Sequence, residues 1–204
     1  MGDGALPDGA ETPGRLPLAV LMSGAPGSGK STLADALAAG LDLPVLHKDQ
    51  LVHAIWRTRD RAMELGAPGL EPFYRTMEVW LELGVSFVAE QTFVRDVSEP
   101  DIARRLAPRC VLVNVHCRSS HARQRFERRM RADPLCGEER LRKLLPLAER
   151  LQSELYEPLA LGCPLIVVDT DDGYAPALQN VIDQIDDAYS RPVIHDLDRP
   201  ASSG

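Results

Sequence analysis

The chain has 204 residues, 44% of them hydrophobic, which is typical of one globular domain with a central sheet covered on both faces. Its formal net charge of −7 argues against binding of nucleic acid through a basic surface. No run of 18 apolar residues and no secretory signal pattern occurs, so we expect a cytoplasmic protein with no membrane partner.

Residues 1–15 and 191–204 carry Gly, Pro and Asp with little apolar content, and we expect two disordered tails around a single domain at 16–190. Within that domain, short apolar runs alternate with longer helical patterns. The predicted strands are Leu18–Ser23, Pro44–His47, Val85–Ala89, Cys110–His116 and Pro164–Asp169. The predicted helices are Lys30–Leu41, Asp49–Leu65, Glu71–Leu83, Ser98–Leu106, Ser120–Asp133, Glu138–Leu155 and Ala175–Tyr189.

Strand runs rich in Val, Leu and Ile without alternation suit a parallel sheet that is buried on both faces. Together with the alternation of strands and helices, they predict a doubly wound α/β fold with right-handed crossovers. In such sheets the ligand crevice lies beyond the carboxyl ends of the strands. The candidate functional residues are therefore sought at those ends.

A complete phosphate-binding loop, G-x-x-x-x-G-K-S, joins the first predicted strand to the first predicted helix. Glycines let backbone N–H groups point at a phosphate, and the helix that follows places its positive end on the same anion. Lys30 can reach the β- and γ-phosphates, and the Ser31 hydroxyl can ligate Mg²⁺. The predicted nucleotide-binding residues are Gly24, Ala25, Pro26, Gly27, Ser28, Gly29, Lys30, Ser31 and Thr32. The loop predicts binding of a nucleoside triphosphate.

Carboxylates follow the second and third predicted strands. Asp49 is predicted to accept the proton of a substrate hydroxyl, or to orient that hydroxyl, and it can also cap the helix that starts there. Glu90 is predicted to hold Mg²⁺ through water, or to bind an acceptor together with Thr92. Arg57 belongs to a helical insert that is expected to cover the acceptor site.

Five arginines crowd the predicted helix 120–133, and Arg125 and Arg129 share one of its faces. Their guanidinium groups are predicted to clamp the transferring phosphoryl group, and the alternative for most of the run is a solvated face. No guanine-specific N-K-x-D signature is present, which favours ATP as phosphate donor and leaves GTP as an alternative. The four widely spaced cysteines are predicted to be reduced thiols.

From about residue 17 to 190, the chain resembles the nucleotide-kinase-like P-loop phosphotransferases, which include chloramphenicol phosphotransferase, polynucleotide 5′-kinase, gluconate kinase and the zeta toxins. The resemblance is carried by the loop 24–32, by Asp49 after the second strand, and by Arg125 and Arg129. It implies a five-stranded sheet in the order 2-3-1-4-5, a helical lid and phosphoryl transfer to a hydroxyl, with Asp49 as catalytic aspartate and both arginines in the lid. Residues 90–92 resemble the zeta-toxin E-G-T segment, with Gln91 in place of the glycine; Arg95 lies one residue later than the family arginine.

The sequence therefore predicts an ATP- and Mg²⁺-dependent kinase with Lys30, Asp49, Arg125 and Arg129 as catalytic residues and a small hydroxylated acceptor. An antibiotic-inactivating enzyme is the most specific version of this prediction. The alternatives are a polynucleotide 5′-hydroxyl kinase, a kinase of a sugar nucleotide, and a non-enzymatic nucleotide switch in which Gln91 orients water. The oligomeric state and the acceptor stay open.

Overall fold

The structure is a computed structural model that describes residues 15–56, 67–132 and 156–191. Its strands are β1 (Leu18–Ser23), β2 (Val45–His47), β3 (Phe87–Glu90), β4 (Val111–Arg118) and β5 (Leu165–Asp169). Its helices are α1 (Lys30–Leu41), α2 (Lys48–Trp56), α3 (Ala67–Glu82), α4 (Glu99–Arg105), the 3-10 turn η1 (Ala107–Arg109), α5 (Ala122–Ala132) and α7 (Leu178–Ser190).

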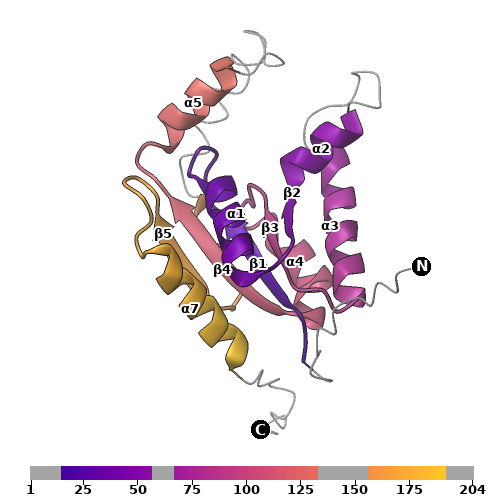
Figure 1. The fold of residues 1–204 in the computed structure, drawn as a ribbon. Coiled ribbons are helices and arrows are strands. Elements are labelled where there is room, and N and C mark those ends of the chain that lie inside the picture. Colours follow the sequence, from indigo (N-terminus) through magenta and orange to yellow (C-terminus); the bar gives the residue numbers. More distant parts are fainter. Residues whose placement is uncertain (1–14, 57–66, 133–155, 192–204) are drawn as a thin grey trace, which may run out of the picture.

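The strands form one parallel sheet in the order β2-β3-β1-β4-β5, with helices on both sides (Figure 1), which confirms the predicted fold and strand order. In the register of the sheet, Met22 and His47 both pair with Glu90, and Ser23 pairs with His116. Because all strands run in the same direction, their carboxyl ends meet at one edge. The loops after β1, β2 and β3 therefore converge on the same crevice.

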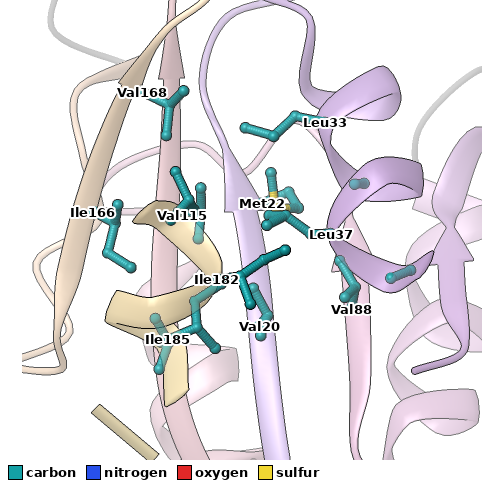
Figure 2. Close-up of a cluster of buried hydrophobic side chains, with 14 of the residues drawn as sticks. Val20, Met22, Leu33, Leu37, Val88, Val115, Ile166, Val168, Ile182 and Ile185 are labelled. Carbon is teal, nitrogen blue, oxygen red and sulfur yellow. The ribbon is translucent and has the colours of Figure 1, made fainter. Parts of the chain in front are cut away.

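One face of the sheet packs against α1 and α7. Side chains alternate between the two faces of a strand, so Val20 and Met22 of β1 point to this side together with Val115 of β4. Figure 2 shows Leu33 and Leu37 of α1 and Ile182 and Ile185 of α7 closing over these strands. This packing fixes the position of α1, whose first turn follows the phosphate-binding loop.

The other face packs against α3 and α4. Phe73 and Met77 of α3 are fully buried against Phe87 of β3, and the Trp80 ring lies 5.5 Å from the ring of Phe87. Trp80 is thus a packing residue of this core. This second core holds the insert that follows β2 in place beside the carboxyl edge.

A buried arginine ties α3 to α4. Arg105 Nε lies 2.7 Å from Glu78 Oε1, and Arg105 Nη1 lies 2.7 Å from Glu71 Oε2. The guanidinium also lies 4.9 Å from the centroid of the Tyr74 ring. Hydrogen bonds from Arg105 lower the pKa values of both carboxyl groups. Because the Arg105 guanidinium is paired with two carboxylates, its buried charge is compensated. Removal of Glu78 would leave a costly unpaired charge.

Most predicted elements agree with the structure, and their ends show where tertiary contacts intervene. Helix α3 begins at Ala67, four residues before the predicted start, and includes Pro72. Helix α7 begins at Leu178 because Ala175 instead makes two backbone hydrogen bonds with Asp169. Strand β3 extends to Glu90 because that residue pairs with both neighbouring strands. The predicted helix at 138–155 lies outside the described residues.

The two ends of the described body meet at the edge opposite the phosphate-binding loop (Figure 1). The Arg15 guanidinium lies over the Tyr189 ring and donates to the Tyr189 carbonyl oxygen, while the Tyr189 hydroxyl donates to the Leu16 carbonyl oxygen at 3.1 Å. The segment before β1 is therefore fixed to the last turn of α7.

Three of the four cysteines lie in the described residues, and all three are free thiols. Burial raises the pKa values of Cys110 and Cys117 to about 12, so both stay protonated at neutral pH. Cys136 lies outside the described residues. Among the described helices, none combines the length and apolar character that a membrane crossing requires.

Candidate active site

The phosphate-binding loop between β1 and α1 is built on three glycines with positive φ: Gly24 (127°), Gly27 (83°) and Gly29 (85°). A Cβ atom at Gly24 would overlap the carbonyl oxygen of Cys117, at the end of β4. A Cβ at Gly27 would lie 2.9 Å from the backbone nitrogen of Phe126 in α5. Positive φ and close backbone contacts together explain why these positions need glycine. The loop is thus enclosed by β4 and α5.

The first turn of α1 is open to an anion. Its N-cap is Gly29, which has no side chain to accept hydrogen bonds from the first backbone N–H groups, and the turn contains no acidic residue. Unpaired N–H groups and the helix dipole make such a terminus an anion site. Ser31 lies in this turn and is half-buried. The geometry is that of a site for the phosphates of a nucleotide.

Lys30 is the cation of this loop and is 5% exposed. Its Nζ donates a 2.9 Å hydrogen bond to the Ala25 carbonyl oxygen, so the side chain folds back over the loop. Burial lowers the pKa of Lys30, and the nearby Glu90 carboxylate opposes that shift. A phosphate group in the loop would supply the negative charge that favours the ammonium form.

Glu90 lies at the end of β3 and is 7% exposed. Its Oε2 lies 3.1 Å from His47 Nδ1, and His47 Nε2 lies 2.8 Å from Asp35 Oδ1. The hydrogen bond with Glu90 is the main reason why the pKa of His47 rises to about 9. His47 and Asp35 were not predicted as site residues, because nothing in the sequence relates positions on three different elements.

Two further residues predicted to bind the acceptor follow the ends of β2 and β3. Asp49 is in the first turn of α2 with a side chain that is 76% exposed, and its Oδ1 lies 3.5 Å from Lys48 Nζ. Thr92 is half-buried, just beyond β3. Gln91 is buried, with its side chain in hydrogen-bonding reach of Tyr74. Arg57 lies outside the described residues.

The arginines of α5 have different surroundings. Arg125 is half-buried and donates to the carbonyl oxygens of Thr170 and Asp171, each at 3.0 Å. Arg129 is exposed, lies 5.8 Å from the Phe126 ring centroid, and is near enough for its charge to lower the pKa of Lys30. Arg125 is thus anchored to the segment after β5, whereas Arg129 is an exposed arginine against the Phe126 ring.

The segment after β5 fastens the loop and α5 together. The Thr170 hydroxyl donates to the Ser28 carbonyl oxygen at 2.8 Å. Asp171 accepts hydrogen bonds from the hydroxyls of Ser119 and Ser120, just before α5, at 2.5 and 2.6 Å. Thr170 and Asp171 were not predicted as site residues; their one sequence signal is that they follow a strand end.

A divalent cation fits the donor set at this loop. Mg²⁺ in nucleotide sites is held by the phosphates, by water and by one or two protein oxygens rather than by a protein cage. The Ser31 hydroxyl and the Glu90 carboxylate are oxygen donors of that kind. In the described part of the chain, no group of three or more His, Cys, Asp or Glu residues could hold a metal without the nucleotide.

A family model described as an AAA domain matches residues 20–151. A presumed kinase from Chloroflexus aurantiacus J-10-fl is 25% identical, with a TM-score of 0.69 over 85% of this chain and 99% of that chain. A sugar kinase from Janibacter sp. HTCC2649 is 19% identical, with a TM-score of 0.56 over 84% and 95%. The Mycobacterium tuberculosis APS kinase CysC, solved with AMPPNP and APS, is 19% identical, with a TM-score of 0.55 over 84% and 99%. No curated protein sequence gives a significant match.

Proposed function

Because the chain belongs to this AAA-domain family and has the P-loop kinase fold, we propose that it transfers the γ-phosphate of ATP to a hydroxyl group of a small molecule. The observation that carries the proposal is the position of the loop 24–32, whose open α1 terminus and Lys30 share the carboxyl edge of the sheet with Asp49 and Glu90. A cation site and an acid–base group beside a phosphate site are what phosphoryl transfer needs.

In this proposal the loop amides and Lys30 bind the β- and γ-phosphates. The acceptor oxygen attacks the γ-phosphorus, the bond from that phosphorus to the β–γ bridging oxygen breaks, and ADP leaves. Asp49 accepts the hydroxyl proton, a role that its exposed position allows. Mg²⁺, held with the nucleotide by Ser31 and Glu90, would neutralise phosphate charge. Arg129 contacts the transferring group, whereas Arg125 anchors α5 to residues 170 and 171.

The formal net charge of −7 and the pairing of several cations on α2, α3 and α4 favour a small acceptor over a polynucleotide. The cations Arg75 and Arg105 pair with carboxylates within 3.0 Å, and Lys48 lies beside Asp49. A nucleic-acid strand needs unpaired cations along its phosphates. An uncharged, hydroxyl-bearing metabolite or antibiotic does not.

A screen for ADP release tests the proposal. Purified protein is incubated with ATP, Mg²⁺ and a panel of sugars, polyols, sugar nucleotides, hydroxylated antibiotics and 5′-hydroxyl oligonucleotides. We expect acceptor-dependent ADP release with a small hydroxylated compound, and a decrease of about 10²–10³-fold in rate for Lys30→Ala. Release that needs the oligonucleotide would contradict the small-acceptor proposal. Equal rates for wild type and Lys30→Ala would contradict the kinase mechanism.

A further inference from the structure

Three titratable side chains from three elements form a continuous chain between solvent and the nucleotide site. Asp35 is on α1, His47 ends β2 and Glu90 ends β3, with N···O distances of 2.8 and 3.1 Å on the two sides of the imidazole. His47 and Glu90 are 6% and 7% exposed, while the Asp35 side chain is 62% exposed. At the inner end of this chain, the Glu90 carboxylate lies close enough to Lys30 to raise the pKa of its ammonium group.

The two carboxylate partners of His47 determine how its imidazole ring forms hydrogen bonds. An ionised carboxylate only accepts hydrogen bonds, so a ring with a carboxylate oxygen at each nitrogen donates from both nitrogens. His47 is thus an imidazolium that donates Nδ1–H to Glu90 and Nε2–H to Asp35. With both nitrogens engaged, neither the ring nor the Glu90 carboxylate can rotate without loss of a charge-assisted hydrogen bond.

The hydrogen bond from His47 restrains one of the two oxygens of the Glu90 carboxylate. Within the described ranges, His47 is the one hydrogen-bond partner of Glu90, and it engages Oε2. The other carboxylate oxygen, Oε1, is left for a group at the crevice. Asp35 sits on α1, the helix that continues from the phosphate-binding loop, so the chain also links that helix to the end of β3.

We propose that His47 and Asp35 are positioning residues, which hold the Glu90 carboxylate in the orientation that supports Mg²⁺ with the bound nucleotide. The inference rests on the proposed function, in which Glu90 serves that ion. Loss of a group that orients a metal-binding side chain typically lowers metal affinity by about 10–100-fold. His47 acts on Glu90 directly, and Asp35 acts through His47 by fixing the plane of the ring.

Two substitutions at His47 separate the two hydrogen bonds. The amide nitrogen of Asn is as many bonds from the backbone as Nδ1, and that of Gln is as many as Nε2. His47→Asn can keep the bond with Glu90, whereas His47→Gln can keep only the bond with Asp35. Both variants remove the positive charge, so they are matched controls for each other. Urea unfolding is used to check that both are folded under the assay conditions.

The measurement is the dissociation constant of ADP by calorimetry, with Mg²⁺ and with EDTA. We expect His47→Gln to reduce the Mg²⁺-dependent gain in affinity about tenfold, with the EDTA value unchanged, and His47→Asn to stay within about threefold of wild type. Asp35→Ala, at an exposed position, is expected to reduce the gain about threefold. Equal effects of Asn and Gln at His47 would overturn the proposal, and an unchanged gain in Asp35→Ala would remove Asp35 from it.

Glu90→Gln distinguishes failure of this inference from failure of the proposed function. If Glu90→Gln abolishes the Mg²⁺-dependent gain while His47→Gln retains it, Glu90 serves the ion and the positioning role is wrong. If Glu90→Gln retains the gain, the role of Glu90 in the proposed function is itself wrong.

Discussion

Substitution of Gly27 by alanine probes the contact between the phosphate-binding loop and α5. Gly27 has φ of 83°, and a Cβ there would lie 2.9 Å from Phe126 N and still closer to the Ala122 carbonyl oxygen. Positive φ alone costs a non-glycine residue about 1–2 kcal/mol. Overlap with the helix backbone adds about 1–3 kcal/mol, because neither neighbour is a flexible side-chain end.

Gly162 supplies the matched control. It has φ of 65°, and a Cβ there would have no atom within 4 Å. Gly162→Ala therefore retains the conformational cost and lacks the overlap. In urea unfolding we expect Gly162→Ala to lose about 1–2 kcal/mol and Gly27→Ala to lose about 2–5 kcal/mol.

The overlap also has a catalytic consequence. Relief of the clash moves the loop and α5 apart by about 1 Å, and a displacement of that size can cost about 10²-fold in rate. We expect kcat to fall by about that factor in Gly27→Ala and to stay near wild type in Gly162→Ala. Equal losses of stability and equal kcat values in the two variants would refute the contact between the loop and α5.

Asp49→Asn should retain ADP affinity and lose about 10²–10⁴-fold in kcat, because the amide keeps the shape but cannot accept the proton; unchanged kcat would leave Asp49 as a helix cap only. Arg129→Ala should lower kcat by about 10²–10³-fold with little change in nucleotide affinity. Arg125→Ala should mainly destabilise the protein, by about 1.5–3 kcal/mol, because it removes hydrogen bonds from a charged group. The reverse pattern would contradict the roles given to these arginines. His47 has a pKa that is raised to about 9 in the folded state, so its stabilising charge is fully present below pH 6.5 and is lost as the pH rises through 9. The free energy of unfolding should fall by about 1–3 kcal/mol across that window in wild type but not in His47→Asn, and parallel pH profiles would rule the imidazolium out as the cause.

The parts of the site that are contiguous in sequence could be predicted. The loop 24–32 has its own pattern, and Asp49 and Glu90 follow apolar runs whose ends must meet at one edge of a parallel sheet. The chain from Asp35 through His47 to Glu90 joins three separate elements, and it exists only because β2 pairs with β3 beside α1. Periodicity could not reveal it.

Arg125 and Arg129, the two arginines predicted for a lid, show the same limit. Helical spacing places Arg125 and Arg129 on one face, but it cannot say what lies opposite that face. The difference between them comes from Thr170 and Asp171, which approach Arg125 from the end of β5. Their catalytic roles remain predictions, whereas the anchoring of Arg125 is a property of the fold.

The contacts between Arg15 and Tyr189 have a practical consequence for redesign of the chain. The two ends of the described body lie together, away from the phosphate-binding loop (Figure 1). A short linker could join them in a circular permutant, with little loop-closure entropy, and new ends could be opened at an exposed turn. A reporter domain fused directly to Arg15 or Arg191 would, for the same reason, be attached away from the phosphate-binding loop.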